Sequence, residues 1–183
     1  MMAARRMRAD ARRNRELLLE AADAGFGEYG VEASLGQIAR RAAVAAGTLY
    51  AHFPSRAALV AALLRARHDA LFELGDSLPG KEIATWVRAV TAHAAAYRGL
   101  AGFLAAGLDD AASELHDDCA RMAVITERLV SEARAARLLE PDVTAADVLA
   151  VTNAAAWTRE QVGGTQADRL IEVAMRGFRR GPG

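Results

Sequence analysis

Apolar residues recur at helical spacing along most of the chain. The first run places apolar or small residues three or four positions apart, at Leu18, Ala21, Ala22, Gly25, Phe26 and Tyr29. This spacing puts them on one face of an α-helix. Gly30 follows at a position where a helix readily ends. The pattern therefore predicts a first helix with one buried face.

Two short helices and a longer one are predicted next. Ser34 followed by Gln37 is a capping-box pattern, and it opens a helix that turns Ile38 inward. A second short helix fits residues 45–53, and Pro54 ends it just before a longer helix begins. Two short helices joined by a tight turn and flanked by longer ones are typical of a helix-turn-helix.

The rest of the sequence predicts a second helical region, which a turn over residues 75–80 separates from the first. Its helices are expected over residues 81–98, 100–108, 112–136, 145–162 and 167–179. Thr144 and Asp147 are placed to cap the fourth of these helices, and Gly163-Gly164 separates the fourth from the fifth.

Composition supports an all-α fold. Hydrophobic residues make up 52% of the chain but aromatic residues only 5%, and long stretches consist of the strong helix formers Ala, Leu, Arg and Glu. We predict a basic arm and a three-helix helix-turn-helix domain over residues 1–56. A larger helical domain is expected over residues 57–183, connected through the helix at about 55–74.

Several classes of chemistry find no support in the sequence. A single cysteine, Cys119, excludes an internal disulfide, and no His, Cys or carboxylate spacing indicates a metal site. The sequence contains no nucleophile motif and no glycine-rich loop after a strand. It also has no long apolar segment and no signal peptide. We therefore expect a cytoplasmic protein without metal, cofactor or membrane partner.

Charge is distributed unevenly although the net charge is zero. The first fifteen residues hold one aspartate, Asp10, and six arginines, namely Arg5, Arg6, Arg8, Arg12, Arg13 and Arg15. This local excess of five positive charges suits an arm that contacts phosphates. The alternative interpretation is a solvated tail.

The segment over residues 34–59 resembles the DNA-binding signature of the TetR/AcrR family of bacterial transcriptional regulators. The run Gly47-Thr48-Leu49-Tyr50-Ala51-His52-Phe53 matches the pattern Gly-Thr-Leu-Tyr-x-His-Phe, and Ile38-Ala39 and Arg56 stand at the expected offsets. The resemblance implies that the second short helix enters the major groove of double-stranded operator DNA. It also implies a ligand-responsive homodimer, and a repressor by default.

Physical requirements of groove binding agree with this resemblance. Small residues such as Gly47 and Thr48 permit close approach to the bases, while Tyr50 and His52 are expected to bind phosphates. Arg56, in the first turn of the next helix, is expected to bind another phosphate. Arg40 and Arg41 are either phosphate contacts or solvated charges. The candidate DNA-binding residues are Ser34, Arg40, Ala45, Ala46, Gly47, Thr48, Tyr50, His52 and Arg56.

The turn before the recognition helix departs from the family pattern. It reads Ala43-Val44-Ala45, where glycine, an aliphatic residue and Ser or Thr are usual. Ala43 would have to adopt a strained conformation at a cost of about 1 kcal/mol, and Ala45 has no side chain that caps a helix. Base readout is then expected to depend on apolar contact with thymine methyls and on Thr48.

Residues 85–100 and 139–147 further resemble the C-terminal domain of one TetR subfamily, which implies a domain that binds an effector and dimerises through its last two helices. Helical spacing selects as effector-site candidates Trp86, Val90, His93 and Tyr97 on one helix and Cys119, Met122, Ile125 and Thr126 on another. The dimer-interface candidates are Ala150, Asn153, Ala154, Trp157, Leu170, Ala174 and Phe178. Plain core packing competes with the first assignment, and a Trp157 turned into its own core competes with the second.

Two alternative functions stay open at this point. A small all-helical enzyme or carrier domain would have a similar composition, and specific binding to promoter DNA would separate it from a regulator. A regulator whose second domain only dimerises would have a dry, fully packed interior.

Overall fold

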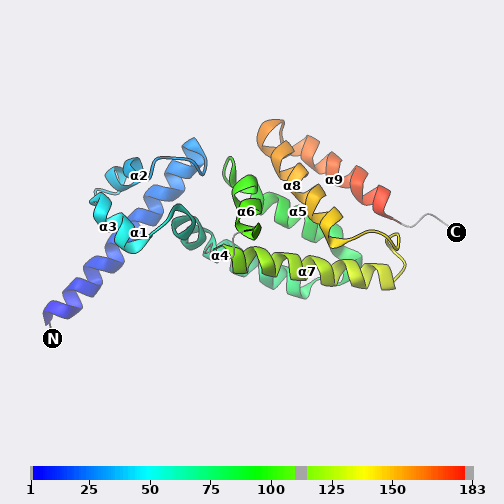
Figure 1. Ribbon diagram of the computed structural model, residues 1–183, viewed down its shortest axis with the longest axis horizontal. Coiled ribbons are helices and arrows are strands. Elements are labelled where there is room, and N and C mark those ends of the chain that lie inside the picture. Colours follow the sequence, from blue (N-terminus) through cyan, green and yellow to red (C-terminus); the bar gives the residue numbers. More distant parts are fainter. Residues whose placement is uncertain (1, 110–114, 180–183) are drawn as a thin grey trace. The chain divides into compact units, whose positions relative to one another are not determined.

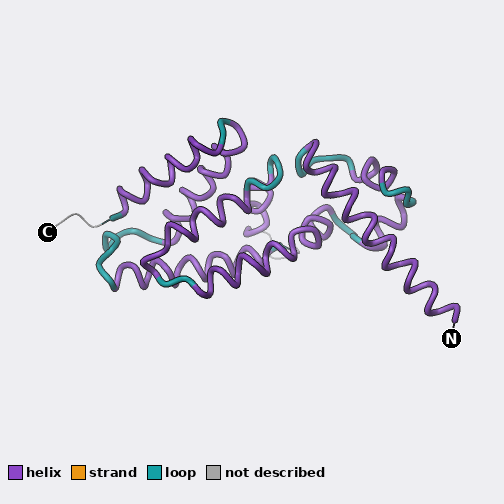
Figure 2. Tube along the Cα trace, turned by 180° about the vertical axis from the view of Figure 1, so that it is seen from behind, coloured by secondary structure: helices purple, strands orange, loops and turns teal. Residues whose placement is uncertain are grey.

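The computed structural model describes residues 2–109 and 115–179, and the described chain is helical with connecting loops and no strand (Figures 1 and 2). Its elements in order are α1 (Met2–Tyr29), α2 (Leu35–Arg41), α3 (Ala46–His52), α4 (Arg56–Ser77), the 3-10 turn η1 (Gly80–Glu82), α5 (Ile83–Ala94), α6 (Leu100–Asp109), α7 (His116–Ala135), α8 (Ala145–Gln161) and α9 (Gly164–Phe178). An isolated backbone bridge pairs Leu139 with Arg179. The predicted all-α fold is confirmed.

The chain divides into two compact units, Met1–Arg65 and Ala66–Gly183. The first unit holds α1, α2, α3 and the beginning of α4, and the second holds the remainder of α4 and every later helix. The units therefore meet inside α4, whereas the sequence places the boundary just after Arg56. The first turns of α4 belong to the first unit, and their residues Leu59 and Val60 are buried.

The first unit is built on α1, which begins at Met2 and so includes the basic arm as regular helix. Alanine and arginine are strong helix formers, which explains why no break separates the arm from the apolar run that follows. The N-terminal half of α1 extends beyond α2 and α3 (Figure 1). Gly30, with φ of 81°, ends the helix and donates its N–H to the carbonyl oxygen of Phe26.

The second unit packs α5 and α7 against the later part of α4 and against α8. Trp86 on α5 is its largest fully buried side chain. Gly75 permits this packing, because a Cβ atom there would lie 2.6 Å from the Trp86 ring and 2.9 Å from Ile125. The Thr144 and Asp147 side chains form the predicted reciprocal capping box at the start of α8. The helices α8 and α9 lie side by side (Figure 1).

Three predicted helices have boundaries that differ from those in the structure. The helix expected over residues 81–98 is a 3-10 turn followed by α5, which ends at Ala94 because the N–H of Ala96 bonds to the carbonyl of His93 and closes a tighter turn. The helix α4 continues to Ser77, beyond the expected end at residue 74. The helix α9 begins at Gly164, because Gly163 with φ of 131° interrupts the backbone there. The expected start of α7 at residue 112 lies outside the described residues.

Candidate DNA-binding and ligand-binding sites

The turn between α2 and α3 has the strain that its sequence predicts. Ala43 has φ of 54°, in the left-handed region that alanine adopts at a cost of about 1 kcal/mol. Ala45 is the N-cap of α3 and makes no side-chain cap hydrogen bond. By contrast, one half of the predicted capping box of α2 is confirmed, since the N–H of Gln37 donates to Ser34 Oγ at 3.4 Å.

The helix α3 separates its inward and outward residues clearly. Leu49 and Phe53 are buried and anchor the helix in the core of the first unit. Tyr50 is 53% exposed, and His52 is half-buried with its ring 6.3 Å from the Phe53 ring. Among the other candidates, Thr48 is half-buried, whereas the exposed residues are Ser34, Arg40, Ala45, Ala46 and Gly47. The exposed surface at the start of α3 therefore carries almost no side-chain bulk.

Gly47 is not required by the packing of the protein. A Cβ atom built at this position meets nothing within 4 Å. Glycine inside a helix nevertheless costs about 1 kcal/mol relative to alanine. The open space in front of Gly47 is what a recognition helix needs where its backbone approaches DNA closely.

Arg56 has a partner inside the protein. Its guanidinium donates to the carbonyl oxygen of Val31, and to that of Ala33 at 2.8 Å. These bonds tie the first turn of α4 to the loop between α1 and α2, and so help to position both short helices. Sequence reasoning missed this positioning role, because Val31 is 25 residues away along the chain. Phosphate binding by Arg56 stays a prediction.

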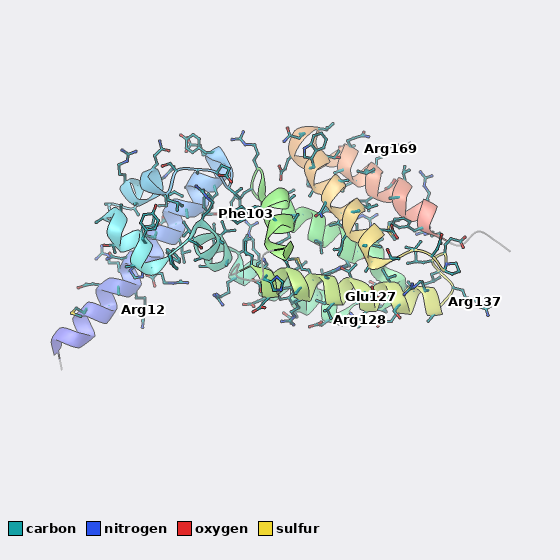
Figure 3. All side chains as sticks on the ribbon, viewed as in Figure 1. Arg12, Phe103, Glu127, Arg128, Arg137 and Arg169 are labelled. Carbon is teal, nitrogen blue, oxygen red and sulfur yellow. The ribbon has the colours of Figure 1, made fainter. Side chains whose placement is uncertain are left out.

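The basic arm divides into engaged and exposed arginines. Arg15 is engaged, with its guanidinium carbon 5.4 Å from the centre of the Phe53 ring. Arg12 and Arg13 are exposed, and Arg12 extends from the N-terminal half of α1 (Figure 3). The side chains of Arg5, Arg6 and Arg8 lie outside the described residues.

The exposed α2 arginines differ from each other. Arg41 pairs with Glu28 of α1 at 3.1 Å. A hydrogen bond with the Tyr29 hydroxyl and this pairing with Arg41 together lower the pKa of the Glu28 carboxyl. Arg40 is exposed, and no ion pair is shown for it within the described residues. Of the two, Arg40 is the one available to phosphate.

In the second unit, all eight effector-site candidates are buried. Trp86 donates its indole N–H to Thr126 Oγ1 at 2.8 Å, and that hydroxyl donates to the Met122 carbonyl oxygen at 2.7 Å. Tyr97 lies in the loop after α5, with the Arg67 guanidinium 5.6 Å from its ring centre. The expectation that Tyr97 continues the helical face of Trp86 is therefore wrong, because α5 ends three residues earlier.

A small cavity of about 50 Å³ adjoins part of the predicted pocket. Val90, Cys119 and Met122 line it, together with residues of α6 and α8 that the sequence did not select for the effector site, namely Leu104, Ala105, Leu149 and Asn153. Drug-sized ligands occupy about 300–1,000 Å³, so the cavity in this state holds only a fragment of one. Burial raises the pKa of the Cys119 thiol to about 11, which keeps the cavity wall uncharged there.

A polar cluster lies buried beside these residues. His68 of α4 approaches Asp118 of α7, with Nδ1 and Oδ2 separated by 2.7 Å, and its ring centre is 4.7 Å from that of His93. Burial, and after it the electrostatic effect of His68, lower the pKa of His93 from 6.5 to about 3, so His93 is neutral near pH 7. No local pattern predicts this cluster, because its members come from three separate helices.

An open groove of about 410 Å³ lies between the start of α6 and the end of α8. Gly102 lies on the α6 side, and Trp157 and Glu160 lie on the α8 side. The groove and the small cavity share two wall residues, Ala105 and Asn153. The two spaces are thus adjacent, and the groove leads from the surface toward the interior.

The predicted interface residues of α8 are exposed. Trp157 is 60% exposed, which excludes the alternative that it turns into its own core. Ala150, Asn153 and Ala154 are also exposed, whereas Leu170, Ala174 and Phe178 of α9 are half-buried. An exposed tryptophan among small residues is typical of a surface that another protein covers.

The described residues form neither a membrane-spanning helix nor a metal-binding cluster. None of their helices is long and apolar enough to cross a membrane. No group of three or more His, Cys, Asp or Glu side chains within these residues is arranged to hold a metal ion.

Two family models match the chain. The model of bacterial regulatory proteins of the tetR family matches residues 18–63, and the model of the SbtR-like transcriptional regulator C-terminal domain matches residues 78–180. No curated protein matches the chain.

Solved structures give the same result. The TetR transcriptional regulator SCO0520 from Streptomyces coelicolor is 30% identical with a TM-score of 0.60, and the match covers 92% of this chain and 99% of that one. A TetR regulatory protein from Mycobacterium vanbaalenii is 29% identical with a TM-score of 0.54, covering 95% and 99%. FadR from Bacillus subtilis, crystallised with stearoyl-CoA, shares the fold at 16% identity with a TM-score of 0.60, covering 89% and 98%.

Proposed function

The chain belongs to the TetR family of transcriptional regulators and binds DNA through its helix-turn-helix, and on this premise we propose that it is a cytoplasmic, homodimeric repressor that leaves its operator when a small molecule binds the second unit. The single observation that carries the proposal is the surface of α3. Leu49 and Phe53 fix this helix to the core, while Gly47 and Tyr50 face solvent. The start of α3 therefore leaves space for the bases at Gly47, and the Tyr50 hydroxyl is available to a phosphate.

Readout of the operator follows from the small side chains of α3. Ala45, Ala46 and Gly47 are exposed and offer no side-chain hydrogen bonds, so they distinguish bases by apolar contact, chiefly with thymine methyl groups. Thr48 supplies one hydroxyl. Tyr50, His52 and the arginines of α1 bind phosphates, which positions the protein without reading sequence. Specificity then depends on thymine placement and on the shape of the DNA.

Dimerisation sets the distance between the two heads. Two recognition helices enter successive major grooves on one face of DNA when they lie about 34–36 Å apart. A ligand that binds more tightly to a dimer with a different spacing weakens operator binding. A hundredfold loss of operator affinity requires about 2.7 kcal/mol of difference in ligand binding between the two states.

Mobility shift on operator DNA selected from a random pool tests this function. The wild-type chain should bind the selected DNA much more tightly than unrelated DNA, whereas an all-helical enzyme or carrier would show no such preference. Tyr50→Phe and His52→Ala should each weaken binding to both DNAs by a similar factor. If either variant changed the preferred bases while keeping its nonspecific affinity, the assignment of these residues to phosphate would be wrong.

Replacing thymine with deoxyuridine in the selected operator tests the mode of readout. This change removes only the methyl group that the small residues of α3 are proposed to contact. Affinity should fall at the one or two thymines that face Ala45 and Ala46, and it should stay unchanged at thymines in the flanks. Equal affinity for every substituted operator would contradict methyl readout.

A further inference from the structure

The groove between α6 and α8 has the size of a ligand site, whereas the cavity behind it does not. Its volume of about 410 Å³ lies within the range of small-molecule pockets. Its α6 wall is made of small residues, including Gly99, Ala101 and Gly102. A Cβ atom at Gly102 would meet nothing within 4 Å, so the packing of the protein does not require glycine there. The space in front of Gly102 is open.

The groove and the cavity provide two different environments for one molecule. The cavity is lined by Val90, Leu104, Cys119 and Met122, and it suits the apolar end of a ligand. The groove adds Trp157 and Glu160. Ala105 and Asn153 border both spaces, so a molecule that extends from the groove past these two residues would reach the cavity.

Glu160 gives the groove its chemical preference. Its Oε2 accepts the N–H of Gly99 at 2.9 Å, which holds the carboxylate at the groove wall. Its Oε1 has almost no exposed surface and no hydrogen-bond partner among the described residues, so a donor in the groove reaches it once the carboxylate turns toward the groove. A carboxylate oxygen in this condition gains from a donor, and most from a charged donor.

Trp157 adds a second feature that favours a cation. Its indole is 60% exposed, and it lies one helical turn before Gln161 and three residues before Glu160 in the wall of the same groove. The face of an indole attracts organic ammonium groups. Arg98 also borders the groove, but it is exposed, so water and salt screen its charge.

We propose that the groove between α6 and α8 is the mouth of the effector site and that it takes an amphipathic organic ammonium, with the ammonium at Glu160 and Trp157 and the apolar end in the cavity behind Asn153. This inference rests on the proposed function, because it names the class of molecule that releases the operator. It also connects the ligand to the proposed interface, since Asn153 and Trp157 belong to both. An effector in the groove would therefore act directly on the contact that sets head spacing.

Three ligands with one carbon chain test the preference for a cation. Isothermal titration calorimetry on the full chain at pH 7 would compare n-hexylammonium chloride, sodium n-hexanoate and n-hexanol. Hexylammonium should bind at least tenfold more tightly than hexanoate, with hexanol between them. Equal affinity for hexylammonium and hexanoate, or binding by hexanoate alone, overturns the proposal.

Matched variants locate the site. Glu160→Gln keeps an oxygen for the Gly99 N–H but removes the charge, so it should abolish the preference for hexylammonium over hexanol. Glu127→Gln, at an exposed α7 carboxylate, should leave all three affinities unchanged (Figure 3). Gly102→Leu should block all three ligands while circular dichroism shows normal helicity. Unchanged binding in Glu160→Gln or in a folded Gly102→Leu protein places the ligand elsewhere and overturns the proposal.

Operator binding, measured on the same preparation, separates this inference from the proposed function. A protein that binds the operator but does not prefer hexylammonium keeps its function and loses this site. A protein that binds no operator loses the proposed function, whatever the calorimetry shows. Saturating hexylammonium should weaken operator binding at least tenfold, and an unchanged operator affinity would contradict the effector role.

Discussion

The indole N–H of Trp86 donates to the hydroxyl of Thr126 across 2.8 Å, joining α5 to α7 inside the second unit. Helical spacing selects both residues as effector-site candidates, and the structure shows them hydrogen-bonded to each other. A buried donor and acceptor that satisfy one another stabilise the fold and leave nothing for a ligand to bind. This pair therefore supports the core interpretation at its own level of the two helices, while Val90 and Met122, one turn away on the same faces, border the cavity.

Thr126→Val should destabilise the protein. The change keeps the shape of the side chain but leaves the Trp86 indole N–H buried without an acceptor, which costs about 1–3 kcal/mol. Denaturant unfolding monitored by circular dichroism would measure this loss in the free energy of unfolding. Thr85→Val, at an exposed position of α5, is the control and should change the free energy of unfolding by less than about 0.5 kcal/mol. Equal stability of the two variants would contradict a structural role for the bond.

Gly47→Ala should separate stability from DNA binding. The added methyl group meets no atom of the protein and favours the helix, so the melting temperature should rise by about 1–4 °C. Operator affinity should fall about tenfold or more, because the methyl group occupies space meant for DNA. Gly27→Ala in α1, where a Cβ atom also meets nothing within 4 Å, should stabilise similarly with unchanged affinity. Unchanged operator affinity in Gly47→Ala would show that the DNA does not approach this residue.

His93 should make the second unit sensitive to acid. Its pKa is about 3 in the folded protein and 6.5 ordinarily, because burial disfavours the charged ring. Below pH 6.5 the unfolded chain therefore takes up a proton that the folded chain does not. Stability present above pH 6.5 is lost as the pH falls toward 3, by up to about 1.4 kcal/mol per pH unit. Urea unfolding between pH 7 and 4.5 should give a shallower dependence for His93→Gln, and identical slopes would contradict this account.

Deleting residues 2–8 should reduce the salt dependence of DNA binding. The deletion removes Arg5, Arg6 and Arg8, and each phosphate contact contributes about 0.9 to the slope of log affinity against log salt concentration. The slope should become shallower by up to about 3 units. Fluorescence anisotropy with labelled operator at several salt concentrations measures it. An unchanged slope would identify the arm as a helix that does not contact DNA.

Ala154→Glu should convert the proposed dimer to a monomer. A charge at a close-packed two-fold contact meets its own copy and is left buried without a partner. Sedimentation at micromolar concentration should show a dimeric wild type and a monomeric variant with near-normal helicity and much weaker operator binding. Ala92→Glu, on the exposed side of α5, should stay dimeric. A monomeric wild type, or a dimeric Ala154→Glu, removes α8 from the interface.

Local patterns in the sequence predicted the first unit well. The Ser34 cap and the strained Ala43 turn each depend on residues only a few positions apart, and both are present in the structure. The bond from Arg56 to Val31 was missed, because it joins residues far apart in sequence and nothing in the local pattern requires it.

The second unit was predicted less completely for the same reason. Helical spacing placed Tyr97 on the face of His93, but the periodicity of a sequence does not show where a helix ends, and α5 stops at Ala94. The contact of His68 with Asp118 depends on how α4 and α7 pack. Glu160 was overlooked as well, because an exposed helix often carries glutamates and only the packing against Gly99 distinguishes this one.

The left-handed conformation of Ala43 has a consequence for how the protein can change. Alanine and glycine codons differ by one nucleotide, so the residue that would relax this turn is within reach of a single point mutation. An alanine in this conformation agrees with a head that is stable enough rather than as stable as the fold allows. Ala43 is therefore a position at which laboratory evolution for tighter operator binding should find an early gain without altering any residue that faces the bases.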